Sequence, residues 1–260
     1  MIGRVTQAKA LAVAGLCAST VLASAQGVPI IDANLLKQNL AILAEQERDL
    51  GRQQGRLERS NALLQIDADI IAELDKLIEA GDLMAVMRFC VTHKLNILIS
   101  GGTDTGKSVA LRKIISMIPQ EERVITIEDA RELFPDQPNT VSLIADRGGN
   151  TRTPDMLLEA TLRMRPDRLI VGEVRGKEAM TFLEAVNTGH GGSMTTIHAE
   201  TPELALDRLA IAAGRSDVRM SYNDLRNYIL RTIDVIIQTG RIGETRGIAQ
   251  VYIPAIGDTA

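Results

Sequence analysis

Residues 101 to 108, Gly-Gly-Thr-Asp-Thr-Gly-Lys-Ser, fit the pattern G-x-x-x-x-G-K-[ST] of a phosphate-binding loop. Backbone N–H groups in such a loop form a nest for anions, and the N-terminus of the following helix adds positive potential. Lys107 supplies a cation for the outer phosphates, and the Ser108 hydroxyl is a ligand for Mg²⁺. The sequence therefore predicts a nucleotide site made of Gly101, Gly102, Thr103, Asp104, Thr105, Gly106, Lys107 and Ser108.

Asp104 is an unusual residue in this loop, because it places an acid where phosphates are expected. If the position needs a positive φ, Asp is among the few residues that tolerate it, at a cost of roughly 1 kcal/mol. A carboxylate about 4 Å from a phosphate oxygen would repel it by about 4 kcal/mol at an effective dielectric near 20, and by about 1 kcal/mol in a water-like setting. We therefore expect nucleotide binding at an affinity reduced between about fivefold and about a thousandfold.

Acidic residues follow two short apolar runs further along the chain. Glu173 ends the run RLIVGE, which is the usual place for an acid that completes a magnesium shell or activates water. Glu128 and Asp129 are adjacent, so on a strand only one of them can face a nucleotide directly. We favour Glu128 as the acid that polarises water. The alternatives are a solvated carboxylate at 173 and a pair at 128–129 that only caps a loop.

Histidines occupy two of the segments near these acids. His198 ends the run SMTTIH and could contact a γ-phosphate, whereas His190 lies in the turn sequence TGHGG. A structural histidine with one hydrogen bond is the alternative for each. His93 stands before the first strand, without chemically apt neighbours, and is expected to be structural.

Strand and helix patterns alternate through the chain from residue 95 onward. Thr153-Pro154 and Thr201-Pro202 each combine an N-cap with Pro at the first helical position, and Pro119 and Gly189 end helices. This alternation predicts an α/β fold with a mainly parallel sheet and helices on both faces. Ligands bind such sheets at the carboxyl ends of the strands, where the residues named above fall. The expected strands are 95–100, 124–130, 140–146, 168–173, 193–198, 234–240 and 247–254, and the expected helices 109–118, 156–164, 177–189, 203–213 and 221–232.

The first 65 residues differ from the rest. Arg4 and Lys9 precede an apolar run that ends in Ala23-Ser24-Ala25, which is typical of a secretory signal peptide, the alternative being an ordinary buried helix. The run of about 16 apolar residues falls short of the roughly 20 that span a bilayer. Residues 35–64 have apolar positions at three- and four-residue steps and predict an amphipathic helix. We therefore expect a signal-like segment 1–25, a helical segment 26–65 and a P-loop domain 66–260.

Composition excludes several classes of protein. The 260 residues carry a formal net charge of -4, with three Phe, three Tyr and no Trp, so neither a basic field nor stacking platforms support specific nucleic-acid binding. The two cysteines, Cys17 and Cys90, cannot form a disulfide framework, and no Cys-x-x-Cys occurs. A structural metal is therefore not expected.

Four segments in this order, GGTDTGKS, VITIEDARELF, LRMRPDRLIVGEVRG and TGHGGSMTTIHA, resemble the Walker A, acidic, Walker B and histidine boxes of the secretion (traffic) ATPases of type IV and type II secretion systems. The resemblance covers about residues 66–254. It implies a RecA-like P-loop NTPase fold that binds ATP and Mg²⁺. By this resemblance Lys107 and Ser108 act on phosphate and magnesium, Ser108 and Glu173 hold the metal, Glu128 and Glu173 are catalytic acids, His198 lies near the γ-phosphate, and Arg163 and Arg175 hold phosphate or a neighbouring subunit.

The family also implies assembly and location: a hexameric ring that works with inner-membrane components of a type IV secretion apparatus on the cytoplasmic face. Two departures stand out. The family carries an N-terminal domain that helps enclose the nucleotide, where this chain has about 65 residues of other character, and it usually has Gly at the position of Asp104.

The N-terminal residues conflict with that location. Their opening after the signal, GVPIIDANLLKQNLAILAEQ, resembles the start of a periplasmic minor-pilus subunit of type IV secretion systems. Arg4 and Lys9 would hold the N-terminus inside and send the remainder outside, where ATP is scarce. The alternatives to a motor are thus an exported pilus-associated structural subunit, or a fusion of two secretion-system genes with an inactive ATPase half. Asp104 suggests a third alternative, a polynucleotide kinase, because some of these kinases carry Asp at this place in a similar loop. The acidic, Walker B and histidine boxes do not support that alternative.

Overall fold

A computed structural model describes residues 21–23, 29–31, 41–42, 44–45, 48 and 68–255. The chain divides into two compact units, Met1–Ala68 and Asp69–Ala260. In the first unit, β1 (Val21–Ala23) pairs antiparallel with β2 (Pro29–Ile31). Most of the predicted signal-like segment and of the predicted helix 35–64 lies outside the described residues.

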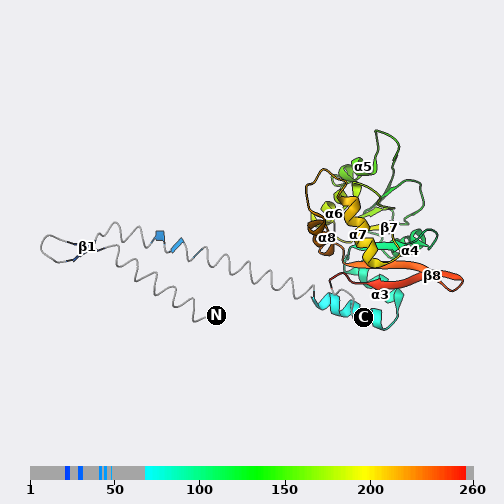
Figure 1. The fold of residues 1–260 in the computed structure, drawn as a ribbon, viewed down its shortest axis with the longest axis horizontal. Coiled ribbons are helices and arrows are strands. Elements are labelled where there is room, and N and C mark those ends of the chain that lie inside the picture. The colour runs from blue at the N-terminus through cyan, green and yellow to red at the C-terminus, as the bar shows by residue number, and fades with distance from the viewer. Residues whose placement is uncertain are drawn as a thin grey trace. The chain divides into compact units, whose positions relative to one another are not determined.

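The second unit is built around a seven-stranded sheet in the order β5-β4-β6-β7-β3-β8-β9 (Figure 1). Within this described sheet, β3 to β8 run parallel and β9 pairs antiparallel with β8. The central strands β3, β4 and β6 are buried along their whole length, which fits their largely apolar sequences. The strands are β3 (Ile97–Gly101), β4 (Val124–Glu128), β5 (Thr140–Ile144), β6 (Arg168–Val171), β7 (Met194–His198), β8 (Val235–Ile242) and β9 (Thr245–Tyr252).

Helices cover both faces of this sheet. One apolar cluster joins α5, α6, α7 and α8 to the sheet, and the second joins α3 and α4 to the other face. Figure 1 shows α6, α7 and α8 gathered together beside the strands. The helices are α3 (Leu83–Thr92), α4 (Lys107–Ile115), α5 (Pro154–Thr161), α6 (Glu178–Asn187), α7 (Pro202–Ala213) and α8 (Tyr222–Leu230), and residues 68–79 are also helical. The predicted α/β fold is confirmed.

The predicted helix starts rest on side-chain caps. The Thr153 hydroxyl accepts the N–H of Met156 at the start of α5, and the Thr201 hydroxyl accepts the N–H of Leu204 at the start of α7. Within the described part of the chain, no helix combines the length and the apolar character that crossing a bilayer requires.

Arg168 is the first residue of β6 and is only 1% exposed, although it lies in a segment predicted as an apolar strand. Its guanidinium forms an ion pair with Glu122 and donates to the carbonyl oxygen of Val91 at 2.7 Å and to that of Gly192 at 3.5 Å. The side chain therefore joins the amino end of β6 to the end of α3 and to the loop before β7. A buried charge with this set of partners stabilises the fold only while the partners stay together.

We expect Arg168→Met to lower the free energy of unfolding by about 2–4 kcal/mol, because the Glu122 carboxylate loses its cation and buried carbonyl groups lose a donor. Urea unfolding at neutral pH measures the loss. The exposed Arg219 provides a matched control as Arg219→Met, expected to change stability by less than about 0.5 kcal/mol. Equal losses in the two variants would contradict the structural role of Arg168.

Candidate functional site

The phosphate-binding loop leaves the carboxyl end of β3 and enters α4. Gly106 is the N-cap of α4 with φ of 93°, and Asp104 has φ of 63°. A Cβ atom on Gly101 would lie 2.1 Å from the Thr239 Oγ1 and 2.4 Å from the Thr105 Oγ1, so only glycine fits there. The helix begins two residues before its predicted start.

Lys107 lies in the first turn of α4 and turns back across the loop. Its Nζ donates to the carbonyl oxygens of Gly101 at 3.0 Å and Gly102 at 2.7 Å. Partial burial lowers the pKa of the ammonium, and Glu173 acts in the opposite direction. The cation is thus held at the mouth of the loop, where the sequence predicted it would neutralise phosphates.

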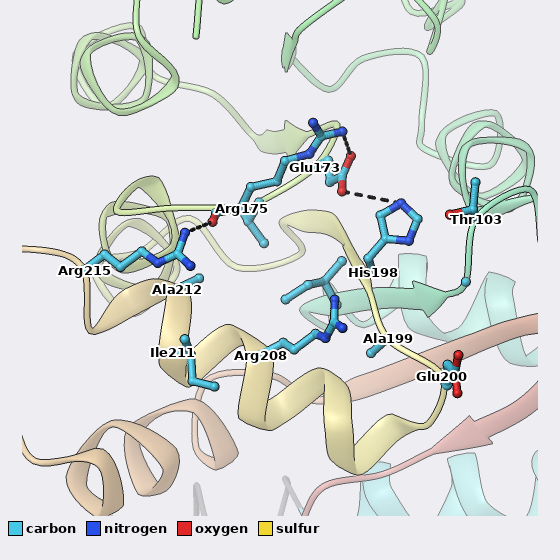
Figure 2. Close-up of a pocket in the computed structure, with 13 residues that line it drawn as sticks. Thr103, Glu173, Arg175, His198, Ala199, Glu200, Arg208, Ile211, Ala212 and Arg215 are labelled. Carbon is cyan, nitrogen blue, oxygen red and sulfur yellow. Dashed lines mark hydrogen bonds and ion pairs between the residues drawn. The ribbon is translucent and has the colours of Figure 1, made fainter. Parts of the chain in front are cut away.

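Figure 2 shows Glu173 and His198 facing each other next to the phosphate loop. Glu173 follows the end of β6, and one carboxylate oxygen forms an ion pair with Arg175 while the other lies 3.9 Å from the His198 Nε2. The Nδ1 of His198 lies 3.4 Å from the Lys107 Nζ. Residues from the phosphate loop and from the ends of β6 and β7 therefore meet at one edge of the sheet.

Electrostatics keep His198 neutral. Burial lowers its pKa from the ordinary 6.5, the Lys107 ammonium lowers it further, and the Glu173 carboxylate offsets only part of the effect. An ammonium can only donate, so the Nδ1 facing Lys107 accepts and the proton resides on the Nε2 facing Glu173. A neutral imidazole with this tautomer can donate one hydrogen bond to an anion near Glu173.

Ser108 and Glu128 are linked through a residue that the sequence reasoning missed, Glu132. The Ser108 hydroxyl donates to the Glu132 Oε2 at 3.2 Å. Glu128 is 4% exposed, and its carboxylate accepts the Thr126 hydroxyl at 3.0 Å and the N–H groups of Glu132 and Leu133 at 2.8 and 2.9 Å. These contacts fit the loop-capping alternative, and a direct action of Glu128 on water stays a prediction. The acid-rich run EDARE was the available signal for Glu132.

Arg163 does not join this group. It is exposed, just beyond the C-cap Leu162 of α5 and before β6 begins, so it lies near the amino ends of the strands. The Arg123 side chain, next to the start of β4, donates to the Met164 carbonyl at 3.0 Å and marks the same edge. The prediction that Arg163 holds phosphate of its own subunit does not fit this position, because the phosphate loop lies at the opposite edge. A contact with a neighbouring subunit stays a prediction.

The other histidines also lie away from the phosphate loop. His190 pairs through its Nδ1 with the Ala185 carbonyl oxygen at 3.0 Å, near the end of α6. The His93 ring packs against Phe89 with 4.1 Å between ring centroids. Both arrangements are those of structural histidines.

Arg147, in the loop after β5, is a second residue that sequence reasoning missed. Its guanidinium binds the Asp129 carboxylate at 2.7 Å, the Glu178 carboxylate at 2.8 Å and the Glu173 carbonyl oxygen at 2.8 Å. Burial alone would raise the pKa of Glu178, but Arg147 and the Arg175 N–H outweigh burial and lower it. Arg147 thus joins the ends of β4, β5 and β6. Its place directly after a predicted strand was the only signal in the sequence.

A pocket of about 700 Å³ opens beside these residues. Thr103, Glu173 and His198 line one side, and the other side is lined by Arg208 and Ile211 of α7 and by Arg215, just beyond the end of that helix (Figure 2). Arg215 also donates to the Arg175 carbonyl oxygen at 2.9 Å. The arginines make the pocket suited to an anion that extends from the phosphate loop.

The strand, phosphate loop and helix in a parallel sheet, with Glu173 and His198 at neighbouring strand ends, define a P-loop NTPase domain of the RecA-like type. The protein family described as "Type II/IV secretion system protein" matches residues 64–241. The chain belongs to this family.

Similar proteins also include type IV secretion ATPases named VirB11. The chain is similar to the type IV secretion system protein VirB11 of Bartonella henselae, 36% identical over 201 residues that make up 75% of this chain and 55% of the relative. It is 35% identical to protein VirB11 of Agrobacterium fabrum over 180 residues, 67% of this chain and 52% of the relative. The chain thus spans about half the length of the curated relatives it matches.

Solved structures show the same fold. The VirB11 ATPase of the Brucella suis type IV secretion system, in complex with sulphate, matches 71% of this chain and 56% of its own with a TM-score of 0.67 and 35% identity. The pilus retraction motor PilT with bound ADP matches 61% of this chain and 47% of its own with a TM-score of 0.51 and 29% identity. The predicted resemblance to secretion ATPases is confirmed.

We expect Arg147→Met to lower the free energy of unfolding by about 1–3 kcal/mol, because the buried Glu178 carboxylate loses its cation. Urea unfolding measures the effect, with Arg219→Met again as the exposed control. In the double variant Arg147→Met/Glu178→Gln no buried charge remains unpaired, so part of the loss should be recovered. A double variant that loses the sum of the two single losses would argue against this pairing.

The lowered pKa of His198 predicts a pH dependence of stability. As the pH falls below 6.5 the unfolded chain binds a proton at His198 while the folded chain does not, so the folded state loses stability until the folded pKa is reached. His198→Gln should therefore lose less stability than the parent between about pH 7.5 and pH 5.5. Thermal unfolding across this range tests it, with His93→Gln as the control for removing a histidine elsewhere. Parallel pH profiles for parent and His198→Gln would contradict the expectation.

Proposed function

We propose that residues 66–260 form an ATP-binding and ATP-hydrolysing motor domain of a type IV secretion or conjugation apparatus. The observation that carries the proposal is the convergence of Lys107, Glu173 and His198 at the phosphate loop of a chain whose relatives include a VirB11 ATPase. The comparisons give no support to the alternative of an exported pilus subunit.

The phosphate loop holds the substrate in this proposal. Backbone N–H groups from Gly102 to Ser108 and the N-terminus of α4 surround the phosphates, and Lys107 exchanges its carbonyl partners for phosphate oxygens. Phosphoryl transfer needs little covalent work from the protein, so positioning and charge neutralisation carry the rate. Lys107 and the pocket arginines supply that positive charge.

Magnesium fits the side chains at this edge, because a hydroxyl and carboxylates are the oxygen ligands that it prefers. Ser108 and Glu173 are the residues that would hold it, and the Glu132 carboxylate already accepts the Ser108 hydroxyl. When bound, the ion supplies positive charge to the β- and γ-phosphates.

Glu173 is the acid best placed to orient the attacking water, because it lines the pocket and faces His198. The family resemblance implies that His198 lies near the γ-phosphate, and in the proposed mechanism the neutral imidazole donates to that phosphate from its Nε2. Glu128 acts indirectly in this mechanism. Its carboxylate accepts the N–H of Glu132 and so positions the loop that contacts Ser108. Arg175 is held by Glu173 until phosphate or a neighbouring subunit competes for it.

We further propose that the domain assembles with copies of itself, as a hexameric ring at the cytoplasmic face of the inner membrane, with inner-membrane components of the secretion apparatus as partners. The family resemblance supports this assembly, and the exposed Arg163 is available for a subunit contact. Nucleotide binding at the pocket edge would then act on neighbouring copies through Arg175, Arg208 and Arg215.

The test is Mg²⁺-dependent ATP hydrolysis by the full chain at several protein concentrations. Lys107→Ala should reduce kcat by at least about 100-fold, because a charge-assisted contact to the transferred phosphoryl group is lost. Lys113→Ala, at an exposed lysine of the same helix, should leave hydrolysis within about twofold of the parent. Activity per chain that rises with protein concentration supports assembly. Equal activity in Lys107→Ala and the parent would overturn the motor proposal.

A further inference from the structure

Asp104 is the acid of the phosphate loop, and its carboxylate forms an ion pair with Arg246 of β9. The two residues are 142 positions apart in the sequence. Both side chains are partly solvated, Asp104 at 64% and Arg246 at 48% exposed. The pair therefore does little for global stability, because water and salt screen exposed ion pairs. Its consequence is local to the loop.

The sheet places Arg246 beside the loop independently of this ion pair. Gly101 of β3 pairs with Thr239 of β8, and Arg246 follows the hairpin turn on the neighbouring strand β9. The position of a Cβ on Gly106 lies 3.9 Å from the Arg246 Cβ. The strand register and the hairpin therefore place the backbone of Arg246 beside the phosphate loop, whether or not the ion pair forms.

Hydroxyl groups fasten the loop to the same hairpin. The Thr105 Oγ1 lies 2.8 Å from the Thr239 Oγ1, and the Thr239 hydroxyl contacts the Ser100 carbonyl oxygen at 3.0 Å. Asp104 therefore lies next to a residue whose side chain is fixed against β8. Asp104 itself has a φ of 63°, and its carboxylate pairs with the Arg246 guanidinium of this hairpin.

An unpaired carboxylate at position 104 would oppose a triphosphate in the loop, since like charges a few ångströms apart repel even in partly solvated surroundings. The Arg246 guanidinium gives the pair no net charge and leaves the positive potential of Lys107 and the α4 N-terminus available. We propose that Arg246 is a positioning residue for nucleotide binding: it holds the Asp104 carboxylate on β9 and thereby keeps the loop able to accept phosphates. The inference rests on the proposed ATP-binding function.

A double-mutant cycle tests it by titration of the full chain with ATP and Mg²⁺ in a calorimeter. Arg246→Met should raise the Kd for ATP by about five- to twentyfold, because the repulsion by an exposed carboxylate is close to that in a water-like setting. In the Asp104→Gly background the same substitution should change the Kd by less than about twofold, because no acid remains to be neutralised. Arg246→Lys should retain most of the affinity. Arg241→Met, opposite Arg246 in the hairpin, is the control and should bind as the parent does.

Kinetics and salt separate this role from a merely structural one. Arg246→Met should raise KM and leave kcat within about twofold, because the repulsion acts on bound substrate and transition state alike. The difference in KM between Arg246→Met and the parent should shrink as the salt concentration rises, since exposed charges are screened. A loss of stability without a change in the KM would contradict the proposal.

Three outcomes overturn the inference, and they differ in what they say about the proposed function. Equal losses from Arg246→Met in the parent and in the Asp104→Gly background mean that Arg246 acts on the phosphates directly or on the fold. Binding by Asp104→Gly but not by the parent means that Arg246 fails to neutralise the acid, while ATP binding by the fold stands. No binding by either protein, with normal thermal unfolding, removes the ATP-binding function together with the inference.

Discussion

The hydrogen-bonded pairing of β3 with its two parallel neighbours is the constraint on which the site depends. The register places Gly101 opposite His198 of β7 and opposite Thr239 of β8. Because these strands run parallel, their carboxyl ends form one edge, and the phosphate loop leaves the sheet at that edge. A slip of one residue would turn the His198 side chain to the other face and would break its approach to Lys107 at 3.4 Å.

Three arginines form ion pairs between separate elements of the domain, and the three pairs have different roles. Arg168 is buried with Glu122 and holds the amino end of β6, so its loss should be felt in stability. Arg147 joins three strand ends at the opposite edge and supports the segment that carries Glu173. The exposed pair of Arg246 and Asp104 differs from both, because its effect falls on the charge that a nucleotide meets. Depth of burial thus separates pairs that hold the fold from a pair that tunes the site.

Much of the domain was predictable because its signals are local. Apolar runs of strand length, the Thr-Pro helix starts and the glycines of the phosphate loop predicted a parallel α/β sheet with the loop at a strand end. The start of α4 was predicted two residues late, because Lys107 and Ser108 are polar and Gly106 caps the helix through its positive φ. The family resemblance assigned Arg163 to phosphate or to a neighbouring subunit, but β6 lies between Arg163 and Glu173 and places them at opposite ends of the strands, so only the subunit contact stays a prediction.

The sequence alone determined the backbone of the phosphate loop, the order of the strands along the chain and the side chains offered at their ends, since each depends on residues next to one another. The tertiary structure decided which side chains those residues meet. Glu128 ends one buried strand and Glu173 follows another, yet the Glu128 carboxylate accepts backbone N–H groups whereas Glu173 lines the pocket. The sequence alone shows an acid at position 104 that would repel phosphates. Its partner Arg246 is 142 residues away in the sequence, so only the pairing of strands in the sheet shows that the two residues meet.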